Sequence, residues 1–220
     1  MIEIPGNGNV IEKEIRISSF IRLHIGIHGL AEIIQSDEEK VIVEADENLQ
    51  DFFQVINSGK TLYVTSEAKL RIPVFTKLKV KIYCRQVHVL NVAGNGDVIC
   101  TNPLISTEPV ELKIHSQGNT SIQVKAPTVK LVSECHGNVE LKGECHELVI
   151  RGAMHGDLHC KEMLADKTTI TTASHGDVTL YSKEEISIKN AGHGDVHYYG
   201  DGRLKNLVHN GHGQVAHKKM

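Results

Sequence analysis

The sequence predicts an all-β fold, a parallel β-helix with rungs of about 19 residues. The first observation is a short phrase around one glycine that recurs seven times from residue 94 onward, usually followed by Asp or Asn and often preceded by His. The seven glycines are Gly96, Gly118, Gly137, Gly156, Gly176, Gly194 and Gly213. Their successive spacings are 22, 19, 19, 20, 18 and 19 residues. A period that survives variation in the residues between is typical of stacked structural units.

The second observation is a period of two within each unit, which is typical of β-strands. Residues at even offsets from the glycine are mostly apolar and are predicted to point inward. Two residues after the glycine stand Val98, Thr120, Val139, Leu158, Val178, Val196 and Val215. Six residues before it stand Leu90, Leu112, Leu131, Ile150, Ile170, Ile188 and Leu207. The glycine also has an even offset, and we expect it at a corner whose inside leaves no room for a side chain.

Two other folds are less consistent with this pattern. A helical solenoid does not fit, because the period is two and the segments are rich in Val, Ile and Thr. An antiparallel sandwich is the structural alternative, since Gly-Asp can also close hairpins. Two further inward columns stand four residues after and eight residues before the glycine, and the fixed register of all four favours the β-helix.

The first 80 residues lack the regular pattern. Residues 41–43 (Val-Ile-Val) and 62–64 (Leu-Tyr-Val) have the composition of strands. Between them, Asp46 is expected to cap a short helix that stops near Gly59. The apolar face of that helix would consist of Leu49, Phe52, Phe53 and Ile56.

The glycine phrase is echoed at residues 6–10 and 28–30, so the coil is expected to begin there and to be interrupted by the helical insertion. We predict one continuous domain. Residues 1–80 would form a β-rich segment with one short helix, the first coils and a cap, and residues 81–220 would form the regular repeats. A cap is useful because the open end of a β-helix is an unpaired edge.

Composition limits the partners and the location. The net charge of the 220-residue chain is -3, which argues against nucleic acid or an anionic membrane as a partner. Aromatic residues make up 4% of the chain, few for stacking on sugars or bases. No stretch approaches the roughly 20 apolar residues of a membrane span. Residues 1–5 show no signal peptide, so a cytoplasmic location is an alternative to the surface.

The five cysteines contain no CxxC pair. Cys100 and Cys160 fall in the same inward column three turns apart, which is roughly 14 Å and beyond disulfide reach. We therefore expect buried free thiols, which favours a reducing compartment.

The order of several segments resembles a known family. A Gly-Asn-Val opening at 8–10 is followed by Ser-Ser-Phe at 18–20 and Val-Ile-Val-Glu-Ala-Asp-Glu-Asn at 41–48. Gly-Lys-Thr-Leu at 59–62 and Gly-Asn-Gly-Asp-Val at 94–98 complete the series. This order resembles the GIN-domain family, described as the head domain of auto-transporter adhesins and common in Bacteroidetes. The resemblance covers most of the chain and implies a right-handed β-helix and an envelope or extracellular location. It brings no catalytic residues.

Two polar columns flank the glycine column at odd, outward offsets. One residue before the glycine stand Asn95, Gln117, His136, His155, His175, His193 and His212. One residue after it stand Asp97, Asn119, Asn138, Asp157, Asp177, Asp195 and Gln214. His159 and His197 follow on the same face, three residues after their glycines. The candidate binding residues are therefore His155, Asp157, His159, His175, Asp177, His193, Asp195 and His197.

These columns have two interpretations. Imidazole and carboxylate groups are suitable ligands for Zn, Ni, Cu or Fe. However, residues two apart on a strand are about 6.6 Å apart, whereas metal–nitrogen bonds of roughly 2.1 Å require the ligand side chains to converge on one ion. Alternatively, Asp and Asn are expected at a repeated corner because they bond to nearby amides. We favour turn chemistry and expect no metal and no cofactor. In both cases the strip should become strongly positive near about pH 5.

The function expected from these observations is a non-catalytic cell-envelope or surface module for adhesion or assembly. Its partner would be a surface glycan or a protein, and homo-oligomers remain open. One alternative is a carbohydrate-active enzyme of the polysaccharide lyase or hydrolase type, by analogy with other β-helices. The other alternative is a His/Asp metal-binding surface. Catalysis is disfavoured because a glycosidase needs two carboxylates across a groove, whereas the Asp column follows a ridge.

Overall fold

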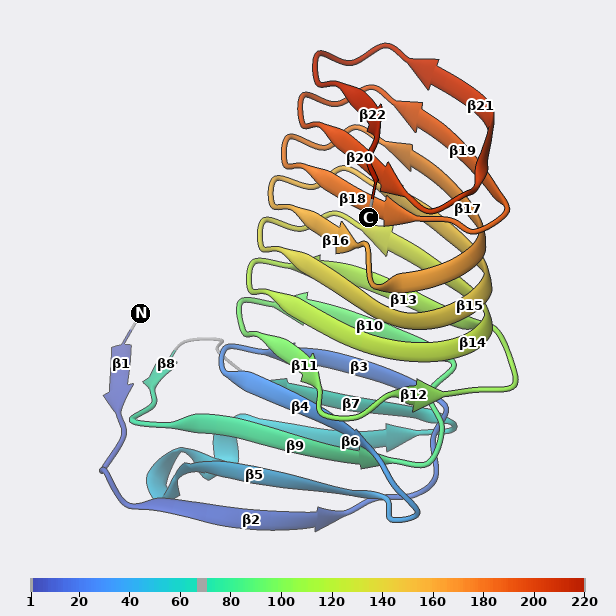
Figure 1. Ribbon diagram of the computed structural model, residues 1–220. Helices are drawn as coiled ribbons and strands as arrows, with labels where there is room; N and C mark the ends of the chain where they lie inside the picture. The colour runs from blue at the N-terminus through green and yellow to red at the C-terminus, as the bar shows by residue number, and fades with distance from the viewer. Residues whose placement is uncertain (1, 67–70, 220) are drawn as a thin grey trace.

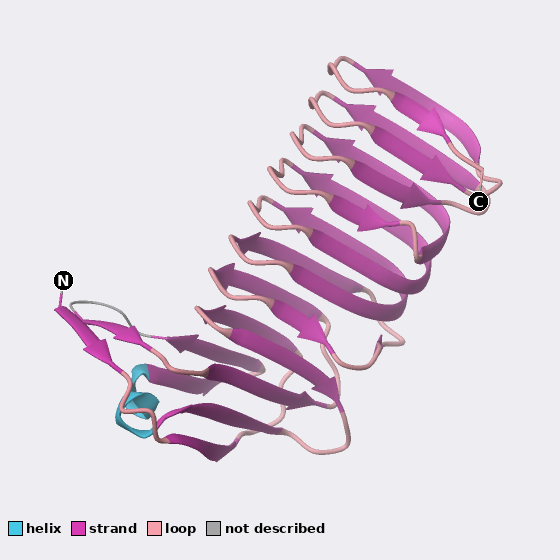
Figure 2. Ribbon diagram, turned by 60° about the vertical axis from the view of Figure 1, so that its left-hand side comes forward, coloured by secondary structure: helices cyan, strands magenta, loops and turns pink. Residues whose placement is uncertain are grey.

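The computed structural model is an all-β solenoid of about six turns, and it describes residues 2–66 and 71–219. From residue 89 onward the rungs stack in chain order up to the C-terminal end, whereas the rung of residues 22–35 lies between the rung that contains residues 61–66 and 78–84 and the rung of residues 89–100 (Figure 1). The prediction of stacked parallel strands is confirmed. A row of short loops follows one edge of the stack, and these loops are the corners that contain the repeated glycine (Figures 1 and 2).

Two rows of parallel strands form the walls of the coil. The first row, which ends in each rung before the corner, consists of β7 (Thr61–Ser66), β3 (Arg22–Ile27), β10 (Val89–Gly94), β13 (Val110–Ser116), the later parts of β14 (Thr120–Ser133) and β15 (Val139–Gly152), β17 (Met163–Thr172), β19 (Glu185–Asn190) and β21 (Arg203–His209). The second row, which follows the corner, consists of β9 (Leu78–Cys84), β4 (Leu30–Gln35), β11 (Val98–Cys100), the first parts of β14 and β15, β16 (Leu158–Cys160), β18 (Val178–Tyr181), β20 (Val196–Tyr199) and β22 (Val215–His217). The short β12 (Leu104–Ile105) pairs with the middle of β14.

Antiparallel strands cap the N-terminal end of both rows. Strand β5 (Lys40–Asp46) pairs with β2 (Val10–Arg16) on one side and β9 on the other, and β6 (Phe53–Ser58) forms a hairpin with β7. Strands β1 (Ile2–Pro5) and β8 (Arg71–Val74) form a separate small parallel ribbon. The C-terminal end differs. Within the described residues β21 pairs only with β19 and β22 only with β20, and all seven residues of β21 are exposed.

The predicted inward columns form the core. From Val98 to Val196, every member of the column two residues after the glycine is at most 1% exposed. The same limit holds from Leu90 to Ile188 for the column six residues before it. Leu207 continues that column into the last rung, where it is 45% exposed because it has a neighbouring rung on one side only. The apolar core is therefore continuous along the stack and ends abruptly.

The glycine column has a different cause from the one we expected. A methyl group at Gly176 would lie 2.2 Å from the carbonyl oxygen of Gly156, and one at Gly194 would lie 1.9 Å from that of Gly176. The side chain is therefore excluded by the backbone of the preceding rung rather than by lack of room inside the coil. None of the seven anchoring glycines has a positive φ. The column begins at Gly29, whose carbonyl oxygen would lie 2.0 Å from a methyl group at Gly96, so the echo at 28–30 is the first corner.

Two expectations for the first 80 residues were wrong. The helix is a single 3-10 helix, η1 (Glu47–Phe52), and Phe53 and Ile56 lie in β6 because they pair with β7. Gly59 is in the β6–β7 turn, with φ +58°. The echo at 6–10 is not a coil rung, since it leads into β2, which is antiparallel to β5.

Asp46 also has a different role from the predicted one. It precedes η1 but makes no side-chain capping bond. Its buried carboxylate instead accepts hydrogen bonds from the backbone N–H groups of Gly8 (2.9 Å) and Thr76 (2.7 Å). Burial opposes ionisation of this group, but the N–H donors outweigh it and lower the pKa of Asp46. The carboxylate thus ties three segments of the cap together.

Candidate functional site

The carboxylate and amide side chains after the glycines form a hydrogen-bonded rail. Asp157 Oδ1 accepts a hydrogen bond from the backbone N–H of Asp177 (2.8 Å), and Asp177 Oδ1 accepts one from Asp195 (2.8 Å). The same bond links every rung from Asp97 to Gln214 at 2.7–3.0 Å. We call Asp97, Asn119, Asn138, Asp157, Asp177 and Asp195 the Asp/Asn rail. Each member satisfies a backbone donor of the next corner, which is the turn chemistry expected from the sequence.

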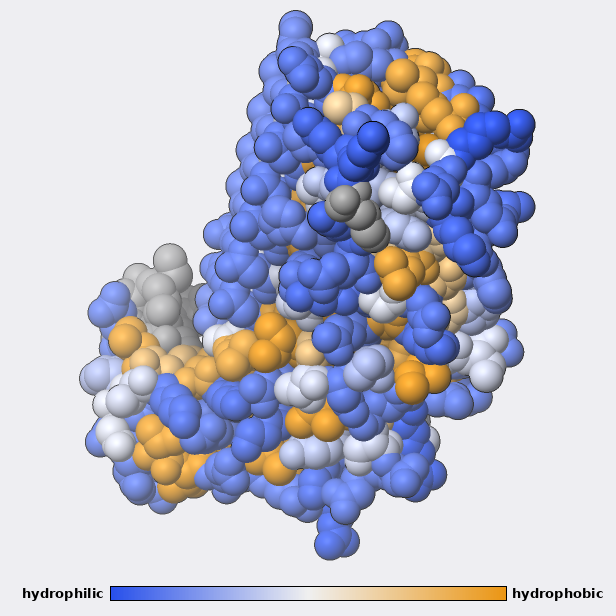
Figure 3. Space-filling model, in the orientation of Figure 1, coloured by the Kyte–Doolittle hydropathy of each residue, from blue (hydrophilic) through white to orange (hydrophobic). Residues whose placement is uncertain are grey.

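The histidines before the glycines form a stack of rings. We call His136, His155, His175, His193 and His212 the imidazole stack. Successive ring centres are 4.6, 5.1, 5.0 and 4.9 Å apart. The first three pairs are parallel within 9°, and the last is tilted by 38°. All five side chains are exposed on the corner, which belongs to the hydrophilic edge of the solenoid (Figure 3).

This geometry does not favour a metal site. Imidazole binds a metal ion in the plane of its ring, and the planes of the first three neighbouring pairs are parallel within 9°, so their nitrogen atoms do not converge on one ion. In residues 2–66 and 71–219, no group of three or more His, Cys, Asp or Glu side chains is arranged to hold a metal ion. His159 and His197 lie one row further along, on either side of Thr179, and are therefore two rungs apart. The eight candidate residues share one ridge and its neighbouring row, and they do not enclose a pocket.

One prediction separates the structural role of the rail from a role for its charge. Asp177→Ala removes the acceptor for the Asp195 N–H, and we expect it to lower the free energy of unfolding by about 1 kcal/mol. Asp177→Asn keeps an acceptor oxygen, as Asn119 and Asn138 already do in their rungs, and should be within about 0.5 kcal/mol of the natural protein. Chemical denaturation measures both. Equal losses in the two variants would show that the charge matters instead.

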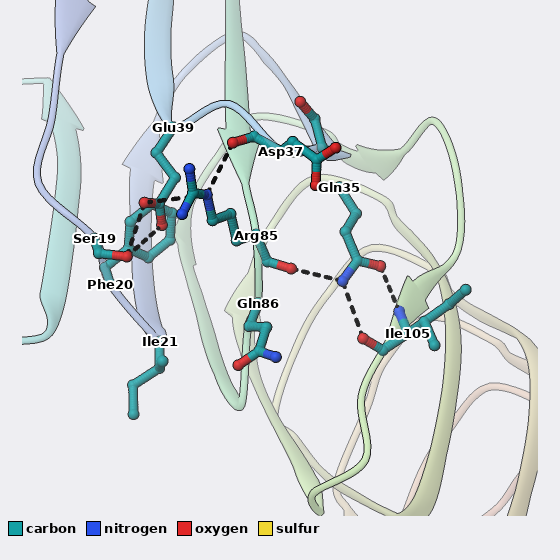
Figure 4. Close-up of a pocket in the computed structure, with 10 residues that line it drawn as sticks. Ser19, Phe20, Ile21, Gln35, Asp37, Glu39, Arg85, Gln86 and Ile105 are labelled. Carbon is teal, nitrogen blue, oxygen red and sulfur yellow. Dashed lines mark hydrogen bonds and ion pairs between the residues drawn. The ribbon is translucent and has the colours of Figure 1, made fainter.

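A hollowed surface lies away from the predicted residues, on the side of the solenoid that carries β12. Two hollows of about 620 Å³ each share Ile105, and we call them together the lateral trough. The first hollow, between the cap and the first coil, is lined by Ser19, Phe20, Ile21, Gln35, Ser36, Asp37, Glu39, Arg85, Gln86 and Ile105 (Figure 4). The second, along β14, β15 and β17, is lined by Ile105, Ser106, Thr107, Lys125, Ala126, Glu144, Cys145, His146, Leu164, Ala165, Asp166, Tyr181 and Lys183.

Side-chain amides hold the first hollow in shape. The Gln35 side chain accepts from the Ile105 N–H (2.6 Å) and donates to the Ile105 carbonyl (3.0 Å), as a neighbouring strand would (Figure 4). Its amide also donates to the Arg85 carbonyl (2.8 Å). Asn102 pairs in the same way with both backbone groups of Gln35 (2.9 and 2.8 Å). These bonds fix β12, and with it Ile105, against β4.

The second hollow has an outward column of alternating chemistry. Ile105, Lys125, Glu144 and Leu164 are in register on successive rungs. At the two ends of the column, the side chains of Ile105 and Leu164 are 57% and 50% exposed. Lys125 and Glu144 lie between these ends and form an ion pair with each other. Hydrophobic surface is visible beside β12 and further along the same side of the stack (Figure 3). This column combines half-exposed apolar surface with charges that already neutralise each other.

Comparisons with known proteins assign the chain to a family. The sequence matches the family described as "Putative auto-transporter adhesin, head GIN domain" over residues 19–202. The chain belongs to this family. No curated protein matches the sequence.

Several solved structures share the fold of this GIN domain. A putative adhesin from Bacteroides fragilis has a TM-score of 0.92 and 22% identity, with 98% of this chain and 100% of that chain covered. A putative lipid binding protein from Parabacteroides distasonis has a TM-score of 0.74 and 22% identity, covering 97% and 99%. A putative adhesin from Parabacteroides merdae has a TM-score of 0.69 and 16% identity, covering 98% and 100%. Cap and coil therefore recur together in these proteins.

Two ionisable groups of the trough in this GIN domain have shifted pKa values. Burial raises the pKa of the Cys145 thiol to about 12, which leaves it protonated and a poor nucleophile. The hydrogen bond from His146 lowers the pKa of Asp166, the opposite of the shift a general acid needs. All five cysteines are free, as expected, and Cys100 is the one that is not fully buried. None of the described helices has the length and apolarity to cross a bilayer.

Proposed function

We propose that this GIN domain is a non-catalytic adhesion module of the cell surface and that its lateral trough binds an extended segment of a partner protein. The family is described by adhesion, which supports a surface location and a surface ligand. The observation that carries the binding site is the column in which Ile105 and Leu164 are half exposed on either side of an ion pair. Large aliphatic side chains held exposed beside a hollow are typical of docking surfaces.

The spacing of the two aliphatic side chains defines the ligand. Ile105 and Leu164 are three rungs apart, or about 14 Å at about 4.8 Å per rung. An extended peptide advances about 3.4 Å per residue, so residues i and i+4 are separated by the same distance and lie on the same face. Apolar side chains at i and i+4 would contact Ile105 and Leu164. A polar residue at i+2 would lie over the Lys125–Glu144 pair.

A protein segment fits this surface better than a glycan. Glycan sites use aromatic rings as stacking platforms, and Tyr181 is the aromatic residue of the second hollow. Aliphatic side chains instead match the apolar side chains of a peptide. The charges of the hollow are paired as Lys125 with Glu144 and Lys183 with Asp166, which also bonds to His146, so they leave little unsatisfied charge for a polar polymer.

The test is selection of a random peptide display library on the natural chain. We expect enriched peptides with apolar residues at i and i+4, and at least about tenfold weaker binding to the variant Ile105→Asp/Leu164→Asp. The matched control is Ile56→Asp, which places the same charge on an aliphatic side chain that is 49% exposed in the cap. Equal binding by the trough variant would contradict the proposal. So would the absence of enrichment together with trough-dependent binding on a glycan array.

A further inference from the structure

The imidazole stack is an ordered surface that the proposed function does not use. Its five rings lie on five successive rungs, so they form a row along the solenoid. Among residues 2–66 and 71–219, none of these rings takes part in a hydrogen bond or ion pair. Because ring N–H bonds lie in the ring plane, parallel stacked rings direct their donors away from the stack axis. Five exposed rings thus offer a regular row of uncommitted nitrogen atoms.

The charged groups around the stack are arranged in rows. On one side is the Asp/Asn rail, whose carboxylates belong to Asp97, Asp157, Asp177 and Asp195. Beyond the rail are His159 and His197 and the Glu140 carboxylate, which accepts a hydrogen bond from Ser121 (2.7 Å). On the other side are His115, Glu134, Lys113, Arg151 and Lys189, with exposed alanines Ala153, Ala173 and Ala191 between. Beneath the stack are Ser116, Met154, Ser174 and the thiol of Cys135, whose pKa is raised by burial.

The sign of the charge on this ridge depends on pH. Aspartate is ionised from pH 5 to 8, whereas imidazole gains its proton near about pH 6.5. The stack and rail together hold four carboxylates, and each ring adds a positive charge when it takes a second proton. With the five rings of the stack and those of His159 and His197 protonated, seven positive groups would outnumber the four carboxylates. The ridge would then attract an anionic polymer that its carboxylates otherwise repel.

We propose that the imidazole stack is a pH-gated binding strip for an acidic polysaccharide. Its positive charges would stand at intervals of 4.6–5.1 Å along one row, which suits a polymer with one anionic group on each sugar. A single-stranded nucleic acid fits less well, because such ligands need aromatic platforms for the bases and the rows beside the stack hold alanine instead. The strip is separate from the lateral trough, so either site can fail without the other.

Fluorescence polarisation of labelled polygalacturonate tests this strip, with labelled neutral dextran as the ligand control. We expect binding of polygalacturonate to strengthen at least about tenfold between pH 7.5 and 5.5 and to weaken with added salt. The variant His155→Gln/His175→Gln/His193→Gln should lose this gain. The matched control His146→Gln/His209→Gln/His217→Gln removes three exposed histidines outside the corner row and should keep it. The control therefore separates a local strip from a change in net charge.

A second variant keeps the test informative if the glutamine variant folds poorly. His155→Lys/His175→Lys/His193→Lys carries permanent charge on the same three rungs. It should bind polygalacturonate equally strongly at pH 7.5 and at pH 5.5. Binding by the natural protein that does not change with pH, or that both histidine triples reduce equally, would overturn the proposal. So would stronger binding of single-stranded DNA than of polygalacturonate at pH 5.5.

Discussion

Replacement of Gly176 by alanine is expected to lower the free energy of unfolding by about 3 kcal/mol, near the upper end for overpacked sites. The added methyl group would lie 2.2 Å from the Gly156 carbonyl oxygen and 2.5 Å from its carbonyl carbon. Because these are backbone atoms, the clash is relieved only by separating two rungs. That separation also stretches the rail bond from the Asp177 N–H to Asp157. Urea denaturation of the variant and the natural protein measures the loss.

The matched control for this substitution is Gly26→Ala. Gly26 lies in β3, and a methyl group there would make an ordinary 3.4 Å contact with the Thr65 side chain. The change in free energy of unfolding should be within about 1 kcal/mol, and it has either sign because alanine also restricts the unfolded chain. Equal losses at Gly26 and Gly176 would show that close contact between rungs is not the reason for the glycine column.

Leu131→Ala is expected to lower the free energy of unfolding by about 2–5 kcal/mol, as for other large-to-small changes in a packed core. Leu131 is 1% exposed, and its strand is paired on both sides, to β13 through Leu112 and to β15 through Ile150. The cavity left by the lost side chain cannot collapse without moving both neighbouring rungs.

The matched control occupies the same column in the last rung. Leu207 is 45% exposed and is paired with Ile188 on one side only, so Leu207→Ala should cost less than about 1 kcal/mol. The two variants can be compared in a single series of thermal denaturation curves. A loss for Leu207→Ala as large as that for Leu131→Ala would mean that the end of the stack is covered in solution.

The coil could be predicted from sequence because each rung repeats the same steric requirement. The glycine column marks where rungs touch, and the alternating apolar columns mark which side is buried. The reason assigned to the glycine was nonetheless wrong, since the direction of its missing side chain depends on how rungs stack. The cap was predicted less well, because η1 and β6 share one apolar run whose division depends on pairing of β6 with β7.

The lateral trough could not be read from the repeat. Ile105 and Leu164 follow their glycines by nine and eight residues, whereas Lys125 and Glu144 follow theirs by seven. These unequal offsets conceal a column that pairing of β12, β14, β15 and β17 brings into register. The sequence offered one signal for this column: an apolar residue stands at a position where rungs of regular length have a charged residue. By contrast, the stacking of the histidines follows directly from their constant offset.

The ridge and the trough therefore have different physical origins. The rail and the glycine column recur because every corner must satisfy the same backbone donor and allow the same close approach. Ile105 and Leu164 satisfy no such requirement. Exposing their apolar side chains to water is unfavourable, and no structural role offsets this cost. This contrast is the reason for assigning adhesion to the trough.

The most direct test of the central claim is a titration of a trough-selected peptide, labelled with a fluorophore, in which binding and the mass of the peptide are followed together. The account predicts saturable binding, at least about tenfold weaker for Ile105→Asp/Leu164→Asp, unchanged for Asp177→Asn, and no change in peptide mass over hours. Cleavage or modification of the peptide would contradict a non-catalytic module. Loss of binding in Asp177→Asn with full binding in the trough variant would place the site on the ridge instead.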